Sequence, residues 1–242
     1  MTELQVHGLK VERSGIALIK GVDFTARSGE ISVLLGSNGA GKTTFLESLS
    51  GIIPSRGGSI TLDGAEISRL HPGARTKFGI GHVEQGRTVF AEMTTEENLK
   101  VALHPDADLQ EAYDLFPELL QRRTVKAGML SGGEQQMLVI ARSLVNHPKV
   151  IMIDEMSSGL APVIVSRLMS VVRKLADAGL AVVLVEQFAT LALAIGNRAY
   201  VLRRGEVVYA GGCEKLANDP ALMHRLYLGD SHGNEQRREV ST

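Results

Sequence analysis

Alternating hydrophobic and polar positions predict short strands in the first part of the chain. Residues 4–11 and 16–26 have the pattern of extended segments, and Ser14-Gly15 is a turn sequence between them. Residues 59–63 form another such segment before a second turn sequence, Asp63-Gly64. These segments predict short strands, the first two of them joined by a tight turn.

Continuous apolar runs of strand length, each followed by a helical pattern, predict a different architecture for the rest of the core. Residues 30–35 (EISVLL) end at a glycine-rich loop, and residues 43–50 then carry helix-forming side chains up to Gly51. A strand, a glycine-rich loop and a helix open a βαβ unit. Later segments continue the alternation, with a strand at 150–154, a helix from Pro162 to Gly179, a strand at 181–185 and a hairpin at 200–209.

The middle of the chain is predicted to be helical. Thr94 and Glu97 have the spacing of a capping box before residues 98–103. Residues 106–120 have helical spacing interrupted at Pro117, and residues 131–146 form a third helix that ends before Pro148. The sequence therefore predicts an α/β core at about 1–89 and 148–230, a helical subdomain at about 90–147, and a polar tail at 231–242.

Composition and charge narrow the functional classes. The 242 residues carry 26 Lys and Arg against 27 Asp and Glu, so the net charge of −1 argues against nucleic-acid binding, which needs a cationic surface. The single cysteine, Cys213, excludes an intramolecular disulfide framework. No apolar stretch approaches the roughly 20 residues of a membrane span, and the N-terminus lacks an export-signal pattern. We therefore expect a soluble cytoplasmic protein.

A phosphate-binding loop is the first candidate site. The pattern G-x-x-x-x-G-K-[ST] is matched by Gly36-Ser37-Asn38-Gly39-Ala40-Gly41-Lys42-Thr43. Glycines allow backbone N–H groups to turn toward phosphate oxygens, and the helix N-terminus that follows, including Thr44, favours an anion. Lys42 would contact the β- and γ-phosphates and the Thr43 hydroxyl would bind Mg²⁺. The alternative is a glycine-rich turn with a solvated lysine, which the position between strand and helix disfavours.

Two carboxylates follow the apolar strand 150–154. Asp154 and Glu155 stand where ligands of parallel sheets gather, at the carboxyl end of the strand. Asp154 would complete the Mg²⁺ shell, and Glu155 would orient or deprotonate the attacking water. Such a pair alone is also typical of a helix cap, but its occurrence together with the phosphate loop favours the Mg²⁺ and water-activating interpretation.

A third motif points to a family. Ser131, Gly132 and Gly133, within LSGGEQQ, precede a helix and could offer a second set of phosphate-binding N–H groups, although an ordinary helix cap would look alike. With the other two motifs at these spacings, residues 3–228 resemble the nucleotide-binding subunit of ABC transporters. The resemblance implies a P-loop NTPase ABC nucleotide-binding domain, with a RecA-like mixed core, the N-terminal antiparallel β subdomain and the inserted α-helical subdomain.

The resemblance also implies function and partners. Two such chains, identical or related, would enclose two ATP molecules, each bound by one chain's loop and the other chain's Ser131–Gly133. Gln85 lies at the family's γ-phosphate and Mg²⁺ sensor. Two membrane-spanning permeases and, indirectly, a periplasmic or surface substrate-binding protein would complete a transporter, and the chain would sit peripherally at the inner face of the cell membrane. The segments 90–99, 158–162 and 185–187 are most similar to the shorter ATPase of branched-chain amino acid importers, whose relatives handle urea or short-chain amides.

Three positions depart from the family pattern. Gln187 replaces the usual histidine, and an amide can donate to a γ-phosphate but cannot move a proton. Arg13 stands where an aromatic residue usually stacks on adenine, and its guanidinium could stack instead or remain solvated. Ala161 replaces a common aspartate. These departures leave two rival interpretations: a nucleotide-gated subunit with degraded hydrolysis, or a soluble ABC protein that acts on DNA or ribosomes, which the lack of a second cassette and of a basic surface disfavours.

Overall fold

Four strands from the N-terminal part of the chain form an antiparallel sheet. The computed structural model describes residues 1–228, so the predicted tail at 231–242 lies outside the described residues. The strand order is β2-β1-β4-β5, with β1 (Glu3–Arg13), β2 (Ile16–Arg27), β4 (Gly57–Leu62) and β5 (Ala65–Glu66). The predicted antiparallel hairpin is confirmed, because β1 and β2 pair with Arg13 opposite Ile16.

A second sheet of six strands forms the centre of the molecule. Its order is β10-β9-β3-β8-β7-β6, and the strands are β3 (Ile31–Leu35), β6 (Ile80–Val83), β7 (Val150–Asp154), β8 (Ala181–Val185), β9 (Arg198–Arg203) and β10 (Glu206–Gly212). All pairs are parallel except the β9–β10 hairpin. The sequence analysis predicted the other five strands of this sheet but not β6, and it did not predict β5 of the smaller sheet.

Side chains alternate between two cores across this sheet. In β3, Val33 packs into one core and Leu34 into the other, and every residue of β3, β7 and β8 is buried. The core around Leu34 includes Phe45 of α1 and the inner face of the small sheet, whereas the core around Val33 includes the helices on the opposite face. Burial on both faces explains why these strands read as continuous apolar runs.

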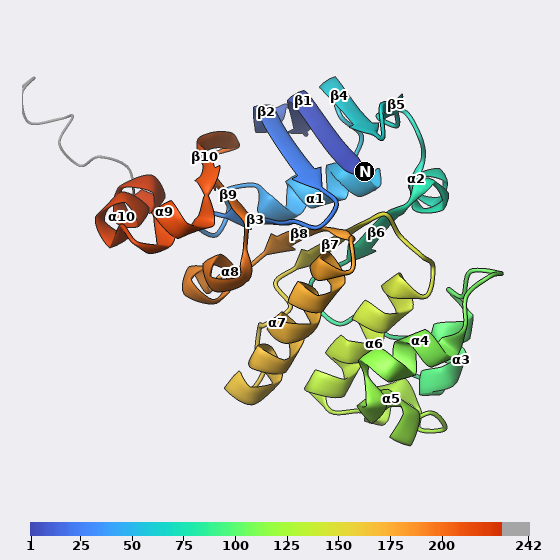
Figure 1. Ribbon diagram of the computed structural model, residues 1–242. Coiled ribbons are helices and arrows are strands. Elements are labelled where there is room, and N and C mark those ends of the chain that lie inside the picture. Colours follow the sequence, from blue (N-terminus) through green and yellow to red (C-terminus); the bar gives the residue numbers. More distant parts are fainter. Residues whose placement is uncertain (229–242) are drawn as a thin grey trace, which may run out of the picture.

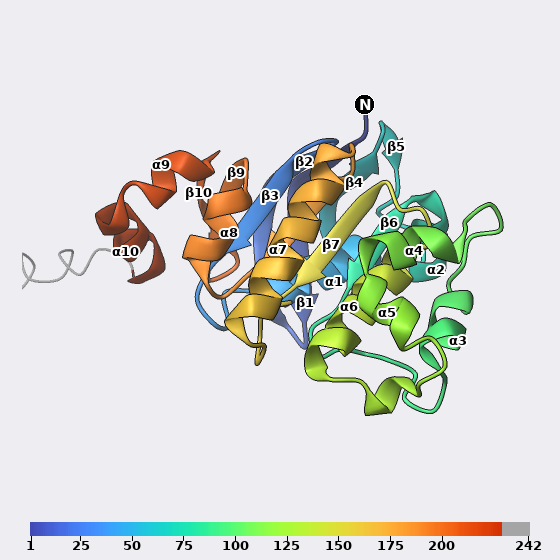
Figure 2. The ribbon, with the colours of Figure 1, turned by 60° about the horizontal axis from the view of Figure 1, so that its bottom comes forward.

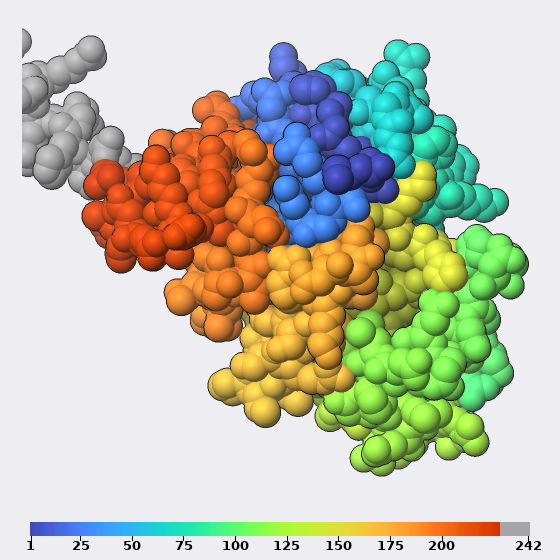
Figure 3. Space-filling view, in the orientation of Figure 1, coloured from blue at the N-terminus to red at the C-terminus, as the bar shows by residue number. Residues whose placement is uncertain are grey.

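Helices cover the sheet and build a separate lobe. They are α1 (Lys42–Ser50), α2 (Pro72–Phe78), α3 (Thr95–Lys100), α4 (Leu109–Leu115), α5 (Pro117–Gln121), α6 (Gly132–Leu144), α7 (Pro162–Asp177), α8 (Ala189–Ile195), α9 (Cys213–Ala217) and α10 (Pro220–Leu228), with a 3₁₀ turn at Ala127–Met129. Figure 1 shows α3 to α6 grouped to one side of the sheet, with α9 and α10 at the other end. Figures 2 and 3 show the same lobe projecting from the body, with α7 between it and α8.

The lobe's boundaries follow local sequence signals. The Thr94 capping box is present, since Thr94 and Glu97 each bond the other's backbone N–H, and α3 begins at the next residue. Pro117 divides α4 from α5, as the sequence predicts. Among the described residues, none of the helices combines the length and apolarity that a membrane span requires.

Candidate nucleotide site

The glycine-rich loop connects β3 to α1 in a backbone shape that needs glycine. Gly36 has φ 152°, and a Cβ atom there would lie 2.3 Å from the carbonyl oxygen of Leu202 on the neighbouring strand β9. Gly41, the N-cap of α1, has φ 107°. The glycines of the motif therefore let the loop pass tightly over the sheet and present the first turn of α1 to the cleft.

Lys42 is buried at the base of this loop. Its Nζ donates to the carbonyl oxygens of Gly36 at 2.9 Å and Ser37 at 3.3 Å, and lies 4.0 Å from Glu155 Oε1. The side chain is only 6% exposed, so its ammonium is held within the loop by fixed acceptors. The loop and the carboxylate strand are thus in contact through one cation.

Thr43 and Asp154 meet although they lie far apart in the sequence. The Thr43 hydroxyl donates to Asp154 Oδ2 at 2.8 Å. Asp154 is 1% exposed, and burial raises the pKa of its carboxyl, while the bond from Thr43 opposes that change. Its second oxygen, Oδ1, is buried and has no hydrogen-bond partner within residues 1–228.

Glu155 is held in an unusual backbone conformation at the end of β7. Its φ is 47°, a left-handed value that is uncommon for a residue with a side chain. Its N–H donates to Val185 O at the end of β8, and its Oε2 accepts from Gln85 Nε2 at 2.8 Å. The left-handed turn directs the Glu155 carboxylate toward Lys42 and Gln85.

A cleft of about 580 Å³ brings most of the predicted residues together. Its lining includes Asn38, Gly39, Gly41, Lys42, Thr43, Thr44, Gln85, Glu155 and Gln187, with two residues that the sequence analysis did not assign to the site, Leu18 and Ser158. Gly36, Ser37 and Ala40 belong to the same loop, and Asp154 lies beneath it through its bond to Thr43. The parallel strands β3, β6, β7 and β8 all end at this cleft, which explains how four distant segments meet.

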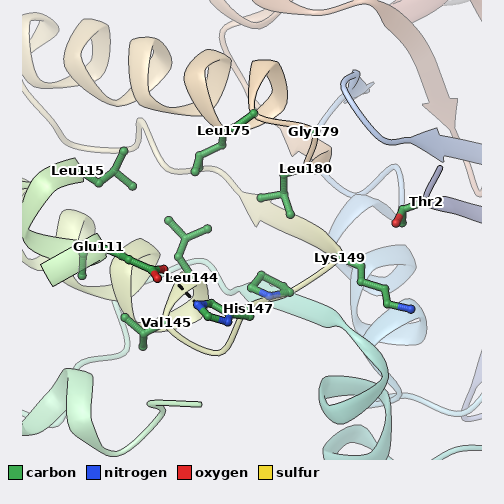
Figure 4. Close-up of a pocket in the computed structure, with 13 residues that line it drawn as sticks. Thr2, Glu111, Leu115, Leu144, Val145, His147, Lys149, Leu175, Gly179 and Leu180 are labelled. Carbon is green, nitrogen blue, oxygen red and sulfur yellow. Dashed lines mark hydrogen bonds and ion pairs between the residues drawn. The ribbon is translucent and has the colours of Figure 1, made fainter. Parts of the chain in front are cut away.

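A separate cavity of about 460 Å³ lies between the lobe and the C-terminal end of α7. Four leucines contribute to its wall, and a hydrogen-bonded pair, His147 and Glu111 at 3.0 Å, lies on one side (Figure 4). No residue of the three motifs lines it. The cleft at the strand ends is therefore the candidate nucleotide site.

Comparison with known proteins identifies the family. The profile of a family described as "ABC transporter" matches residues 19–158, which span the phosphate loop, the LSGGEQQ motif and the Asp154-Glu155 pair. The chain belongs to the ABC transporter family. It is an ABC-type ATPase, and the resemblance and fold class predicted from the sequence are confirmed.

Curated relatives cover nearly the whole ABC chain. The high-affinity branched-chain amino acid transport ATP-binding protein BraG of Pseudomonas aeruginosa is 39% identical over 220 residues, 88% of this chain and 94% of that protein. The probable branched-chain amino acid transport ATP-binding protein LivF of Archaeoglobus fulgidus is 40% identical and covers 81% of this chain and 86% of its own length. The lipopolysaccharide export system ATP-binding protein LptB of Escherichia coli is 33% identical, over 95% of this chain and 98% of that protein.

Solved structures give the same fold. A nucleotide-free ATP-binding cassette from an ABC transporter superposes with a TM-score of 0.84 at 22% identity, over 95% of this chain and all of that one. A dimeric ATP-binding cassette in a post-hydrolysis state, bound to ADP and phosphate, superposes with a TM-score of 0.75 at 25% identity, over 87% and 98% of the two chains.

Some predicted residues of the ABC site lie away from this chain's own cleft. Ser131 caps α6, where Ser131 and Glu134 form a capping box, and neither it nor Gly132 or Gly133 lines the cleft. Arg13 is exposed at the end of β1 and does not line the cleft either. Ala161 is the N-cap of α7 and provides no side-chain hydrogen bond there, so the departure from aspartate leaves this helix without a side-chain cap.

Proposed function

We propose that the chain is the ATP-hydrolysing motor subunit of an importer for branched-chain or related amino acids. The observation that carries the proposal is the cleft in which Lys42, Thr43 and Glu155 converge, in a chain about 40% identical to two ATP-binding proteins named for branched-chain amino acid transport. Import of urea or short-chain amides remains an alternative substrate assignment. The similarity to LptB supports a second candidate, an export partner.

The residues around Asp154 fit a divalent cation. Its buried Oδ1 lacks a partner among the described residues, and its Oδ2 already holds the Thr43 hydroxyl, so one carboxylate and one hydroxyl form a hard-oxygen donor set. Thr43 and Asp154, with Gln85 nearby, would hold Mg²⁺. When bound, the ion would neutralise charge on the β- and γ-phosphates.

The chain's own groups would then carry out hydrolysis. The loop N–H groups and Lys42 bind the triphosphate, and Glu155 orients the attacking water and accepts its proton. Gln85 holds one oxygen of Glu155, so the other oxygen remains near Lys42 and the reacting phosphate. Gln187 lines the same cleft and would donate a hydrogen bond to the γ-phosphate.

A second ABC subunit would complete the site. The helix end at Ser131–Gly133 does not line its own chain's cleft, and its N–H groups are suited to an anion. We infer that the partner's copy of this helix end closes over the γ-phosphate, that Arg13 contacts the base from the hairpin, and that hydrolysis reopens the dimer. The partner would be an identical chain or a related ATPase.

A groove of about 610 Å³ beside the lobe would receive a permease. Its wall includes the exposed apolar residues Ile52 and Val101, and Glu84 and Thr88 line it from the segment that also contains Gln85. This segment thus lines the groove through Glu84 and Thr88 and contacts Glu155 through Gln85. Movement at the γ-phosphate would pass through Gln85 to the membrane-spanning partner, which would hold this subunit at the inner face of the membrane.

The test uses the chain assembled with its permeases. Glu155→Gln should reduce ATP turnover by about 100-fold or more and accumulate an ATP-bound dimer, whereas Lys42→Ala should lose nucleotide binding itself. An unchanged hydrolysis rate in Glu155→Gln would remove Glu155 from the base role. Uptake of labelled leucine, urea and acetamide by cells with and without the chain separates the substrate assignments, and loss of lipopolysaccharide export without loss of uptake would favour the second candidate.

A further inference from the structure

Glu186 is a buried carboxylate at the end of β8 that the nucleotide site does not use directly. It lies between Val185, whose carbonyl oxygen accepts from Glu155, and Gln187, which lines the cleft. Its side chain is 0% exposed and forms no salt bridge within the described part of the chain. Burying a carboxylate without a cation beside it is costly, so the hydrogen bonds that Glu186 accepts must offset that cost.

Both oxygens of Glu186 accept from one residue. Ser157 N–H donates to Oε1 at 3.3 Å, and the Ser157 hydroxyl donates to Oε2. Ser157 is itself buried at 4% exposure. Without Glu186, two polar groups of Ser157 would be left buried without acceptors, and the turn that carries them would have to move.

Ser157 belongs to the same turn as Glu155. This turn is attached to the end of β8 at two points, through Glu155 N–H to Val185 O and through Ser157 to Glu186. Glu155 has the left-handed φ of 47°, which persists only where the surroundings hold it. Ser158, the next residue, lines the cleft and its carbonyl accepts from Arg87.

We propose that Glu186 is a positioning residue of the ATPase, which holds the turn of residues 155–158 through Ser157 and thereby keeps the Glu155 carboxylate aligned for hydrolysis. The inference rests on the proposed role of Glu155. It also gives a physical link between Gln187, on the same strand end as Glu186, and the turn that precedes α7. Burial raises the pKa of the Glu186 carboxyl, and the bonds from Ser157 oppose that change.

The experiment compares Glu186→Ala, Glu186→Gln and Ser157→Ala with the double variant Glu186→Ala/Ser157→Ala in the assembled complex. Ser48→Ala is the matched control, because its hydroxyl is equally buried and bonds a backbone carbonyl away from the cleft. Glu186→Ala should lower kcat by about 10- to 100-fold, as expected for a misaligned catalytic group, and leave KM for MgATP within about threefold. Hydrogen exchange of residues 155–158 should accelerate in the same variant.

Two features distinguish positioning from general destabilisation. Glu186→Gln should recover much of kcat, because the amide oxygen can still accept from Ser157 N–H. The double variant should lose no more than the larger single loss, because Ser157→Ala removes one of the two hydrogen bonds that Glu186→Ala already removes. If Glu186→Ala does not fold, Ser157→Ala is measured in its place. A lowered kcat with faster hydrogen exchange of residues 155–158 supports the proposal, and a kcat equal to that of Ser48→Ala overturns it.

Different outcomes would overturn the role of Glu186 and the hydrolytic role of Glu155. Additive losses, or a change in KM without a change in kcat, would overturn the role of Glu186 while Glu155→Gln still abolishes turnover. Full turnover in Glu155→Gln would instead overturn the proposed hydrolytic role, whatever the Glu186 variants do.

Discussion

Arg75 holds the C-terminal end of α1, the helix that follows the phosphate loop. Its side chain is 2% exposed and donates four hydrogen bonds to backbone carbonyls. Two acceptors, Ser48 O and Leu49 O, belong to the last turn of α1, and the others are Leu70 O at 2.9 Å and Ser68 O at 2.6 Å. The last carbonyl groups of a helix have no hydrogen-bond donor within the helix, and a cation beside them interacts favourably with the negative end of the helix dipole.

Arg75→Met keeps most of the side-chain volume and removes every donor. Four backbone carbonyl oxygens then lose their partner, two of them buried and two partly buried. An unsatisfied buried acceptor costs about 1–3 kcal/mol, so we expect a total loss of about 3–5 kcal/mol. That is a large fraction of the roughly 5–15 kcal/mol by which a domain is stable. The corresponding fall in melting temperature is about 6–20 °C. Arg75→Lys should recover only part of the loss, because an ammonium cannot reach all four carbonyls in the geometry of the guanidinium.

Urea unfolding and thermal scans of the purified chain measure the effect. Arg69→Met is the control, because Arg69 is a neighbouring arginine that is exposed, and it should change the free energy of unfolding by less than about 0.5 kcal/mol. A loss below about 1 kcal/mol in Arg75→Met, or equal losses in the two variants, would refute the reasoning that Arg75 holds the end of α1.

Three further predictions concern the site and its surroundings. Burial lowers the pKa of His82 from 6.5 to about 4, so the folded chain favours the neutral imidazole and the free energy of unfolding should fall as the pH drops from 6.5 to 4. In urea titrations, His82→Gln should remove up to about 3 kcal/mol of this pH-dependent change. Gln187→His should raise kcat in the assembled complex, because imidazole can move a proton, and an unchanged kcat would contradict the inference that the amide of Gln187 limits turnover. Gly36→Ala should weaken both folding and ATP binding, since its Cβ would meet Leu202 O at 2.3 Å. Gly39→Ala, with φ 77° and nothing within 4 Å, should show only the cost of the left-handed backbone, about 1–2 kcal/mol, in the same unfolding and nucleotide-titration assays.

Local signals in the sequence predict much of this fold. The strands β3, β7 and β8 are apolar at every position because both faces are covered, and this pattern can be recognised without a structure. Capping boxes mark the starts of α3 and α6. The phosphate loop is recognisable because its chemistry requires glycine, lysine and threonine at fixed spacing within one continuous segment.

Features that depend on distant partners were not predictable in this way. The strand β6 has only four residues, Ile80–Val83, and includes Gly81 and His82, so its pattern does not distinguish it from a loop. Arg75 looks like any surface arginine of a short helix until its four acceptors are known. The same holds for Glu186, whose partner Ser157 is 29 residues away.

The missed strand is also what makes the site possible. Gln85 lies two residues beyond β6, and β6 pairs with β7 in parallel register, with Val83 opposite Ile153. Parallel pairing places the carboxyl ends of both strands at the same edge, so Gln85 arrives beside Glu155 and their 2.8 Å contact follows from the topology rather than from the loop sequence. The groove proposed for the permease is lined by His82 and Glu84 on either side of the end of that same strand. A displacement of β6 would therefore act on Glu155 and on the surface proposed for the permease together.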